Sequence, residues 1–448
     1  MRRGLLVLFW LIALGLSTQV WADPLSLEDC LKEALSRYPG LEAVRQRVLA
    51  AQAYEKATFK AYFPVLGADY RYTRLRDQRT VIFQGLPLPG LPPKVEVPVS
   101  AHTMTSGEIL LSWPLFHGLA LRVRHQLAKL EVKLAQVERE RVRQELIFHV
   151  KEAYYRLLQA QRRKEEAQKS VERLEAHLKE ARGFYTQGLI AKNDLLQSEV
   201  ALAEAKHALV VAQNAVELAR SRLNILIQRP VTEKTEIIDT LSANSLVPRF
   251  EDCVALALKH RPEVQAGELA VQKAREGVRL AKSSLYPWVD LQAAYQKEAV
   301  DLFLQNNPYG DRENAWVGVV LNWQIWEWGK RFDEISSAKA KVLAQEAALR
   351  EIKDQVALEV RQAILNLSAA KDRLQVTKKS IQLAEENYRL NEARYEEQLA
   401  SSTDVLDAEE MLTRARVNYI NALADYRLAE AYLAYTMGVK KLSASGGR

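Results

Sequence analysis

The chain contains one long sequence pattern twice, and this duplication constrains its fold more than any other feature. Four short segments of the first half return in the second, and the matched pairs are Leu27–Cys30 with Phe250–Cys253, Phe63–Pro64 with Tyr286–Pro287, Val150–Ala153 with Val360–Ala363, and Asp194–Leu196 with Asp404–Leu406. The first two pairs lie 223 residues apart and the last two lie 210 apart. A unit of this length exceeds a solenoid repeat and predicts two structural repeats, residues 23–243 and 244–440. The change of spacing places a 13-residue insertion in the first copy, between Pro64 and Trp113, where an exposed loop is expected.

The amino terminus has the pattern of a secretory signal peptide. Arg2 and Arg3 precede an apolar run, and Val20-Trp21-Ala22 offers a cleavage site, so residues 1–22 are expected to be removed after export. No later stretch approaches the ~20 apolar residues of a membrane-spanning helix, so any entry into a membrane must use strands. Residues 441–448 are expected to form a flexible tail.

The charge pattern argues against nucleic-acid binding. The net charge is +7, and basic residues alternate with acidic ones along helical segments, which is typical of solvated helix surfaces. The two cysteines, Cys30 and Cys253, occupy equivalent places in the two copies, on the apolar side of short amphipathic segments. This placement favours buried, unpaired thiols, and a disulfide in an oxidising compartment is the alternative.

Each copy is predicted to run helix, strand, strand, long helix, tight turn, long helix. The expected strands are 65–76 and 107–116 in the first copy and 288–300 and 315–326 in the second. The expected helical hairpins are 119–228 and 330–437, whose outgoing helices lack proline. Their returning helices carry a heptad with one large and one alanine-rich row, which predicts close coiled-coil packing. The segment 77–105, rich in proline and glycine, is expected to be an irregular loop.

The candidate strands alternate between apolar and other residues, as membrane-spanning barrel strands do. Tryptophans gather in and beside these strands, which predicts an aromatic girdle at the membrane interface, made of Trp113, Trp288, Trp316, Trp323 and Trp326. A soluble sheet with a tryptophan-rich core is the alternative interpretation. Four spanning strands cannot close a barrel in lipid, so several chains must associate. A trimer would supply twelve strands.

In combination, the signal peptide, the two helix–strand–strand–hairpin copies and the alanine-rich hairpins resemble the TolC family of outer membrane efflux channels. The most diagnostic segments are the turns, Tyr185–Ile190 with Asp194–Leu196 and Arg394–Tyr395 with Thr403–Ala408. The resemblance implies a mainly α fold with a transmembrane β-barrel: a homotrimer with a twelve-stranded barrel in the outer membrane, continued by a twelve-helix α-barrel across the periplasm. It also implies partners, namely outer membrane lipid, a periplasmic adaptor protein and an inner-membrane pump.

The resemblance assigns roles to the ends of the hairpins, which would form the periplasmic mouth of the channel. Gly188, Leu189 and Ile190, with Gln398 and Leu399, would dock the adaptor, although apolar residues at a tight turn can also simply pack on each other. Asp404 and Asp407 would form an acidic ring, which favours cations. An aspartate in the first turn of a helix, such as Asp194 or Asp404, can equally serve as a cap.

Tyr395 would hold the mouth closed by bonding to Asp194 of the neighbouring hairpin. The chain departs from the family pattern at Gln398, where glycine is usual, and at Ala400 and Ser401, where an arginine is often found. A closing salt bridge is therefore not expected, and closure would rest on hydrogen bonds and packing.

No catalytic or cofactor motif accompanies these features. The seven histidines form no HExxH pattern, and no phosphate-binding loop or nucleophile motif occurs, so neither an enzyme, a metal site nor a cofactor is predicted. The expected function is a passive exit duct of a tripartite efflux or type I secretion system, with energy supplied by the pump. The alternative is a non-transporting periplasmic coiled-coil or adaptor protein, which would carry one hairpin and no tryptophan-rich strands.

Overall fold

The computed structural model describes residues 24–84, 94–239, 248–310 and 313–439. The predicted signal peptide, residues 1–22, and the predicted tail, residues 441–448, lie outside these ranges. Among the described helices, none has the length and apolar character needed to cross a membrane.

The helices occur in pairs of matching length. The first four are α1 (Leu27–Arg37), α2 (Pro39–Lys60), α3 (Ala120–Thr186) and α4 (Lys192–Ile227), and their counterparts are α5 (Phe250–His260), α6 (Pro262–Ser283), α7 (Lys330–Glu396) and α8 (Ser402–Thr436). The short helices break from the longer ones at Tyr38 and Arg261, which are extended because each precedes a proline. Both α3 and α7 have 67 residues, about 100 Å at 1.5 Å per residue.

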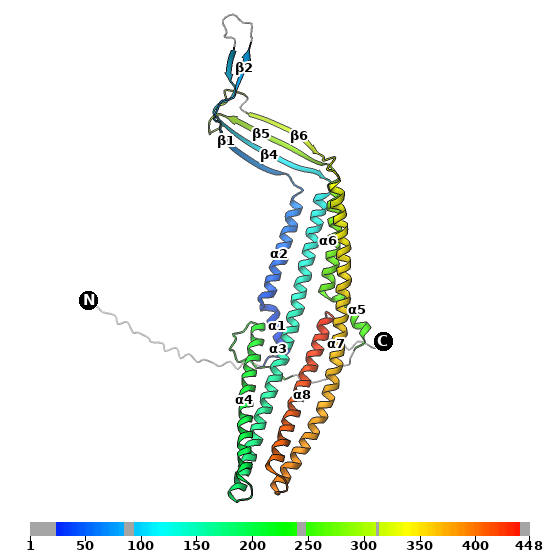
Figure 1. Ribbon diagram of the computed structural model, residues 1–448. Coiled ribbons are helices and arrows are strands. Elements are labelled where there is room, and N and C mark those ends of the chain that lie inside the picture. The colour runs from blue at the N-terminus through cyan, green and yellow to red at the C-terminus, as the bar shows by residue number, and fades with distance from the viewer. Residues whose placement is uncertain (1–23, 85–93, 240–247, 311–312, 440–448) are drawn as a thin grey trace, which may run out of the picture.

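The helices form a single row rather than a globular bundle (Figure 1). In the half nearer the sheet, the neighbours run α2, α3, α6, α7, and in the far half they run α4, α3, α8, α7. We call α3 with α4 hairpin 1, and α7 with α8 hairpin 2. The turns of both hairpins lie at the end of the molecule farthest from the sheet.

At the other end, four strands form an antiparallel sheet in the order β1 (Val65–Arg74), β4 (Thr103–His117), β5 (Trp288–Ala299) and β6 (Glu313–Asn322). The prediction for the last strand was wrong at its end, because β6 stops at Asn322 and leaves Trp323 and Trp326 in the connection to α7. Within the described segments, β1 and β6 each have one unpaired edge.

The prediction of an irregular loop over 77–105 was wrong in part. This segment holds β2 (Thr80–Gln84) and β3 (Lys94–Pro98), an antiparallel pair that projects beyond the sheet, as well as the start of β4 (Figure 1). Four of the five prolines in this segment lie in 87–93, between the two strands, and Pro98 ends β3. The other residues of the two strands are mostly β-branched or aromatic and favour strand.

The sheet has one apolar face and one polar face, because successive side chains of a strand point to opposite sides. The register gathers on one face Leu66, Ala68, Ile109, Leu111, Trp113, Leu291, Ala293, Val317, Val319 and Leu321. The opposite face carries Asp69, Arg71, Glu108, Asp290, Gln292 and Asn314, together with Trp288 and Trp316. Trp113 is thus the member of the predicted girdle that lies on the apolar face within a strand; the girdle itself stays a prediction.

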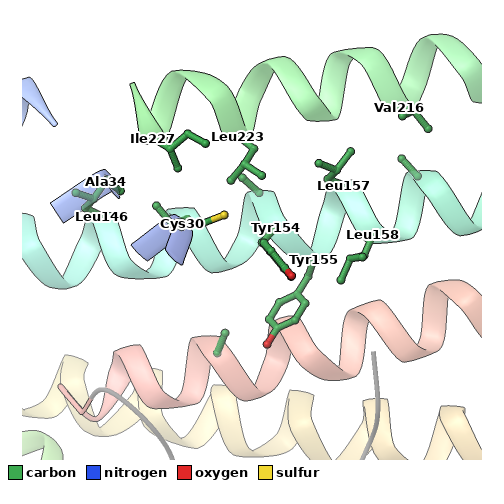
Figure 2. Packing of buried hydrophobic residues seen from close by; sticks show 14 residues of the cluster. Cys30, Ala34, Leu146, Tyr154, Tyr155, Leu157, Leu158, Val216, Leu223 and Ile227 are labelled. Atoms are coloured by element: carbon green, nitrogen blue, oxygen red, sulfur yellow. The ribbon is translucent and has the colours of Figure 1, made fainter. Parts of the chain in front are cut away.

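The core of the described residues contains three hydrophobic clusters, two of which occupy equivalent places in the two copies. Cys30, Val150, Leu157 and Leu223 join α1, α3 and α4, and their counterparts Cys253, Val360, Leu367 and Leu433 join α5, α7 and α8; all eight side chains are at most 1% exposed. Figure 2 shows Cys30 of the first cluster in front of α3, Leu223 and Ile227 pointing from α4 toward α3, and the ring of Tyr155 pointing toward α8. Both cysteines are unpaired, as favoured above, and burial raises the pKa of Cys30 to about 12.

Candidate functional site

The two hairpin turns have the same backbone geometry although their sequences differ. In hairpin 1, Gly188 adopts φ +76°, and the amide of Leu189 donates to the Phe184 carbonyl at 2.9 Å. In hairpin 2, Gln398 adopts φ +58°, and the amide of Leu399 donates to the carbonyl at position 394 at 2.7 Å. Both arrangements cap the last turn of a helix with a left-handed residue. The left-handed conformation suits glycine and strains glutamine.

This difference predicts opposite effects of exchanging the two residues. Gln398→Gly is expected to raise the free energy of unfolding, and Gly188→Gln to lower it, each by up to about 1 kcal/mol per chain. An added Cβ at Gly188 meets nothing within 4 Å, so the backbone angle alone decides the cost. The measurement is the urea midpoint of helix loss by circular dichroism at fixed protein concentration. The double exchange should return the midpoint toward that of the native chain, and shifts of the same sign at both turns would refute the account.

The residues predicted to dock an adaptor lie at these turns. Gly188 and Gln398 are exposed, and Leu189 and Leu399 are 49% and 69% exposed, whereas Ile190 is half-buried. Two exposed leucines at matching turns form an apolar point at the tip of each hairpin. Their role in docking stays a prediction.

The three aspartates near the turns differ in what their carboxylates do. Asp404 completes a capping box: its carboxylate accepts from the amide of Ser401 at 2.9 Å and from its hydroxyl at 2.8 Å. These bonds hold the pKa of Asp404 below its usual range. Asp194 stands at the equivalent place in α4, but the N-cap residue there is Ala191, which has no side chain to reciprocate. Asp407 is exposed, and its counterpart is Gln197.

Tyr395 packs into the contact between the two hairpins. Its side chain is 3% exposed, and its ring lies 4.9 Å from that of His177 and 5.4 Å from that of Phe184, measured between centroids. Within the described part of the chain its hydroxyl has no hydrogen-bond partner. Burial raises the pKa of Tyr395, and the carboxylates of Glu180 and Asp194 add to the rise. The expected bond from Tyr395 to Asp194 is therefore not formed within this chain, and it stays a prediction for contacts between chains.

A polar chain that the sequence did not reveal crosses between the hairpins beside Tyr395. His177 Nε2 lies 2.8 Å from the hydroxyl of Ser402, which lies 3.0 Å from the hydroxyl of Ser198, which in turn donates to the Asp194 carbonyl at 3.0 Å. The three side chains are at most 5% exposed. A signal existed in the heptad: Ser198 stands in the alanine-rich row, where a polar residue requires a partner.

A charge cluster joins the hairpins further from the turns. Arg173 donates to Glu166 at 2.9 Å and to Glu409 at 3.0 Å, and Arg416 lies 3.4 Å from Glu166. Glu409 also accepts from the hydroxyl of Thr413 at 2.8 Å. Both glutamate side chains are 7% exposed. Glu166 and Arg173 are seven residues apart and therefore lie on the same side of α3. This spacing does not show which helix packs against that side.

In the described segments, no group of three or more His, Cys, Asp or Glu side chains is placed to hold a metal ion. The contacts between the hairpins include hydrogen bonds, ion pairs, aromatic packing and the apolar contact of Leu406 with Val171 and Leu174. A further bond from Thr403 to Gln197, at 3.0 Å, completes the connection near the turns. This arrangement can hold two long hairpins together or release them.

Comparison with known proteins identifies relatives with this architecture. The family model "outer membrane efflux protein" matches residues 30–227 and 253–439, that is, both copies. The outer membrane protein TolC of Vibrio cholerae is 23% identical over 440 residues, which cover 97% of this chain and 95% of TolC. Nodulation protein T of Rhizobium leguminosarum bv. trifolii is 19% identical over 75% of this chain and 71% of its own length.

Solved structures share the fold. The outer membrane protein VceC of Vibrio cholerae aligns with a TM-score of 0.75 and 19% identity over 92% of this chain and 96% of VceC. The CmeC outer membrane channel of Campylobacter jejuni aligns with a TM-score of 0.77 and 16% identity, over 94% of this chain and 87% of CmeC. With both sequence copies matched by one family model, the chain belongs to the outer membrane efflux protein family, as an outer membrane transport protein of the TolC type that extends into the periplasm.

Proposed function

We propose that this protein is the exit channel of a tripartite efflux or type I secretion system: a passive homotrimeric duct opened at its periplasmic end by an adaptor and an inner-membrane pump. One observation carries the proposal: a sheet with one apolar face and two free edges continues into a single row of long helices. Such a chain has the shape expected of one part of a larger tubular assembly.

The sheet supports closure with further copies in lipid. Leu66, Val317, Val319 and Leu321 on its apolar face are 62–75% exposed, which is unfavourable in water and favourable against acyl chains. The unpaired edges of β1 and β6 would pair between neighbouring chains, since open edges are not tolerated in lipid. Three chains of four strands would then form a twelve-stranded barrel lined by the polar face.

The helical row supports the same stoichiometry. At each level the chain contributes four helices, so three chains would supply twelve around one axis. The outer helices of the row, α4 and α7, expose apolar side chains along their lengths, among them Val200, Val211, Leu218, Leu358, Leu365 and Leu383. These faces would pack between neighbouring chains, which removes them from water.

The hairpin ends would form the gated mouth. Asp407 from each chain would contribute to an acidic ring that favours cations, while Asp404 also caps α8. Tyr395 and Asp194 would close the mouth through contacts between hairpins, and the turns at Gly188–Ile190 and Gln398–Leu399 would dock the adaptor. A non-transporting periplasmic adaptor is disfavoured, because the chain has two hairpins and an amphipathic sheet.

Single-channel recording in planar bilayers tests the duct. The purified protein is expected to insert and to pass small, cation-preferring currents, and Asp407→Ala is expected to raise the conductance and reduce the preference for cations several-fold. Asp407→Glu, which keeps the negative charge at the same exposed position, is the matched control and should leave both properties nearly unchanged.

Two results would overturn the proposal. One is insertion without current even when Asp404 and Asp407 are both changed to alanine. The other is chemical cross-linking of the membrane-inserted protein that yields monomers or dimers but no trimers, because four strands per chain then cannot close a barrel.

A further inference from the structure

The buried contact between the hairpins contains a titratable side chain that the roles assigned above do not use. His177 lies in α3 and is 5% exposed; it contacts Ser402 at the start of α8, and its ring is tilted by 48° against that of Tyr395 at the end of α7. It therefore touches both helices of hairpin 2 within one turn of their ends. A change in His177 acts directly on the contact between the hairpins.

The order of donors along the polar chain fixes which nitrogen holds the proton. A hydroxyl has one hydrogen to donate. Ser198 uses its hydrogen toward the Asp194 carbonyl, so Ser402 must donate to Ser198 and accept from His177. Nε2 of His177 is thus a donor, and Nδ1 is the nitrogen that gains a proton in acid. Within the described residues, Nδ1 makes no hydrogen bond.

We propose that His177, with Ser402 and Ser198, is an acid-sensitive latch between the two hairpins: neutral His177 holds them together, and protonated His177 releases them. The latch rests on the proposed function in one respect, that the hairpin ends form the channel mouth. Its chemistry depends only on the contacts within one chain.

Burial disfavours a positive charge on His177. The charged groups on the elements around this contact include Glu180 in α3, Asp194 in α4, Glu392, Arg394 and Glu396 in α7, and Asp404 in α8. Burial is the cause that lowers the pKa of His177, with no carboxylate acting against it. Protonation would place an uncompensated charge in the contact.

The direction of the pH effect follows from linkage. An exposed histidine, as in separated hairpins, titrates near pH 6.5, whereas burial lowers the pKa of His177 when the hairpins touch. The contact therefore has its full stability above about pH 6.5 and loses stability as the pH falls toward the lowered pKa. At pH 5.5 the equilibrium shifts toward separation by up to about tenfold.

The neighbouring carboxylates do not all act in one direction. Burial, with the charges of Glu396 and Glu392, raises the pKa of Glu180. Its protonation in acid removes repulsion and favours contact. Asp404 acts in the same direction as His177, because the bonds from Ser401 lower its pKa and its protonation in acid weakens the cap of α8. The comparison of the parent with His177→Gln, which leaves Glu180 and Asp404 unchanged, separates the contribution of His177 from that of the carboxylates.

The experiment measures the distance between the hairpins by double electron–electron resonance, with spin labels at the exposed turn positions 187 and 397 of the full mature chain. Cys30 and Cys253 are replaced by alanine, and labelled chains are diluted into an excess of unlabelled ones so that each assembly carries one pair. Spectra are compared at pH 7.5 and 5.5 for the parent, His177→Gln and His149→Gln. Position 149 lies on the same helix, with a half-exposed histidine, and provides the matched control.

The parent and His149→Gln are expected to show a separated population that rises several-fold at pH 5.5. His177→Gln keeps a hydrogen-bond donor without a titrating group, so its distance should not lengthen in acid. Ser402→Ala, which removes the acceptor, should increase separation already at pH 7.5, and circular dichroism verifies that each variant keeps its helices. An acid response that persists in His177→Gln, or its absence in the parent, overturns the latch.

Failure of the latch and failure of the channel give different results. Acid-dependent separation without ionic current in any variant would support the latch and reject the duct. Current with the same hairpin distance at both pH values would support the duct and reject the latch.

Discussion

Arg173→Ala is expected to lower the free energy of unfolding by about 3 kcal/mol, because it leaves the buried carboxylate of Glu409 without its cation, whereas Glu166 keeps Arg416. Arg173 bridges Glu166 on its own helix and Glu409 on α8, and its side chain is 17% exposed. Burial opposes its charge, and the bonds to Glu166 and Glu409 raise its pKa despite that cost. Removing the guanidinium leaves Glu409 with only the neutral donors of Ser170 and Thr413.

The matched control is Arg182→Ala, further along the same helix. Arg182 pairs with Glu199 at 3.0 Å, but the two side chains are 59% and 41% exposed, so the pair contributes well below about 1 kcal/mol. The measurement is urea unfolding followed by circular dichroism at constant protein concentration. Equal shifts for the two arginines would contradict the role of burial. Glu409→Gln, which retains an acceptor, should cost less than Arg173→Ala.

Leu157→Ala and Leu367→Ala are each expected to lower the free energy of unfolding by about 2–5 kcal/mol. Both leucines are 0% exposed, and they occupy equivalent places in the two core clusters, where α3 or α7 meets its returning helix and its short helix. Truncation removes buried methyl groups and leaves a cavity that the long, continuous helices cannot collapse to fill. The loss is measured by urea unfolding under the same conditions.

The control for this pair is Leu256→Ala in α5, where the side chain is 41% exposed, and its effect should stay within about 0.5 kcal/mol. Both leucines are 0% exposed and lie in clusters that share matching Cys, Val and Leu residues, so the losses at Leu157 and Leu367 should be similar, although other core positions differ, such as Tyr154 against Ile364. A large loss at one site with a negligible loss at the other would contradict equal packing of the two copies.

Most elements of the fold were predictable from local signals. Pro39 and Pro262 mark the breaks between short and long helices, and Gly188 marks the end of α3. The strands were placed by alternation, but the end of β6 and the pair β2 and β3 were missed. In both cases the composition of a segment suggested the wrong structure. The tryptophans beyond Asn322 extended the predicted strand too far, and the proline-rich stretch led to a loop prediction that included the strands on either side of it.

The candidate site was predictable only where a single segment defines it. The capping role of Asp404 follows from its place three residues after Ser401, and the structure forms that box. The partners of Tyr395, His177 and Arg173 did not follow, because a heptad shows that one side of a helix is covered without naming the helix that covers it. His177 and Ser402 are 225 residues apart in the chain.

The sequence by itself determined two amphipathic hairpins, the strands that alternate between apolar and polar faces, and the matching of the two copies, since these depend on periodicity and turn chemistry within short segments. Only the tertiary structure decided that α8 lies between α3 and α7, and thereby that His177 meets Ser402 and that Arg173 meets Glu409. The physical reason is that apolar stripes on helices are interchangeable as packing surfaces, whereas hydrogen bonds and ion pairs exist only once a particular pair of stripes has been brought together.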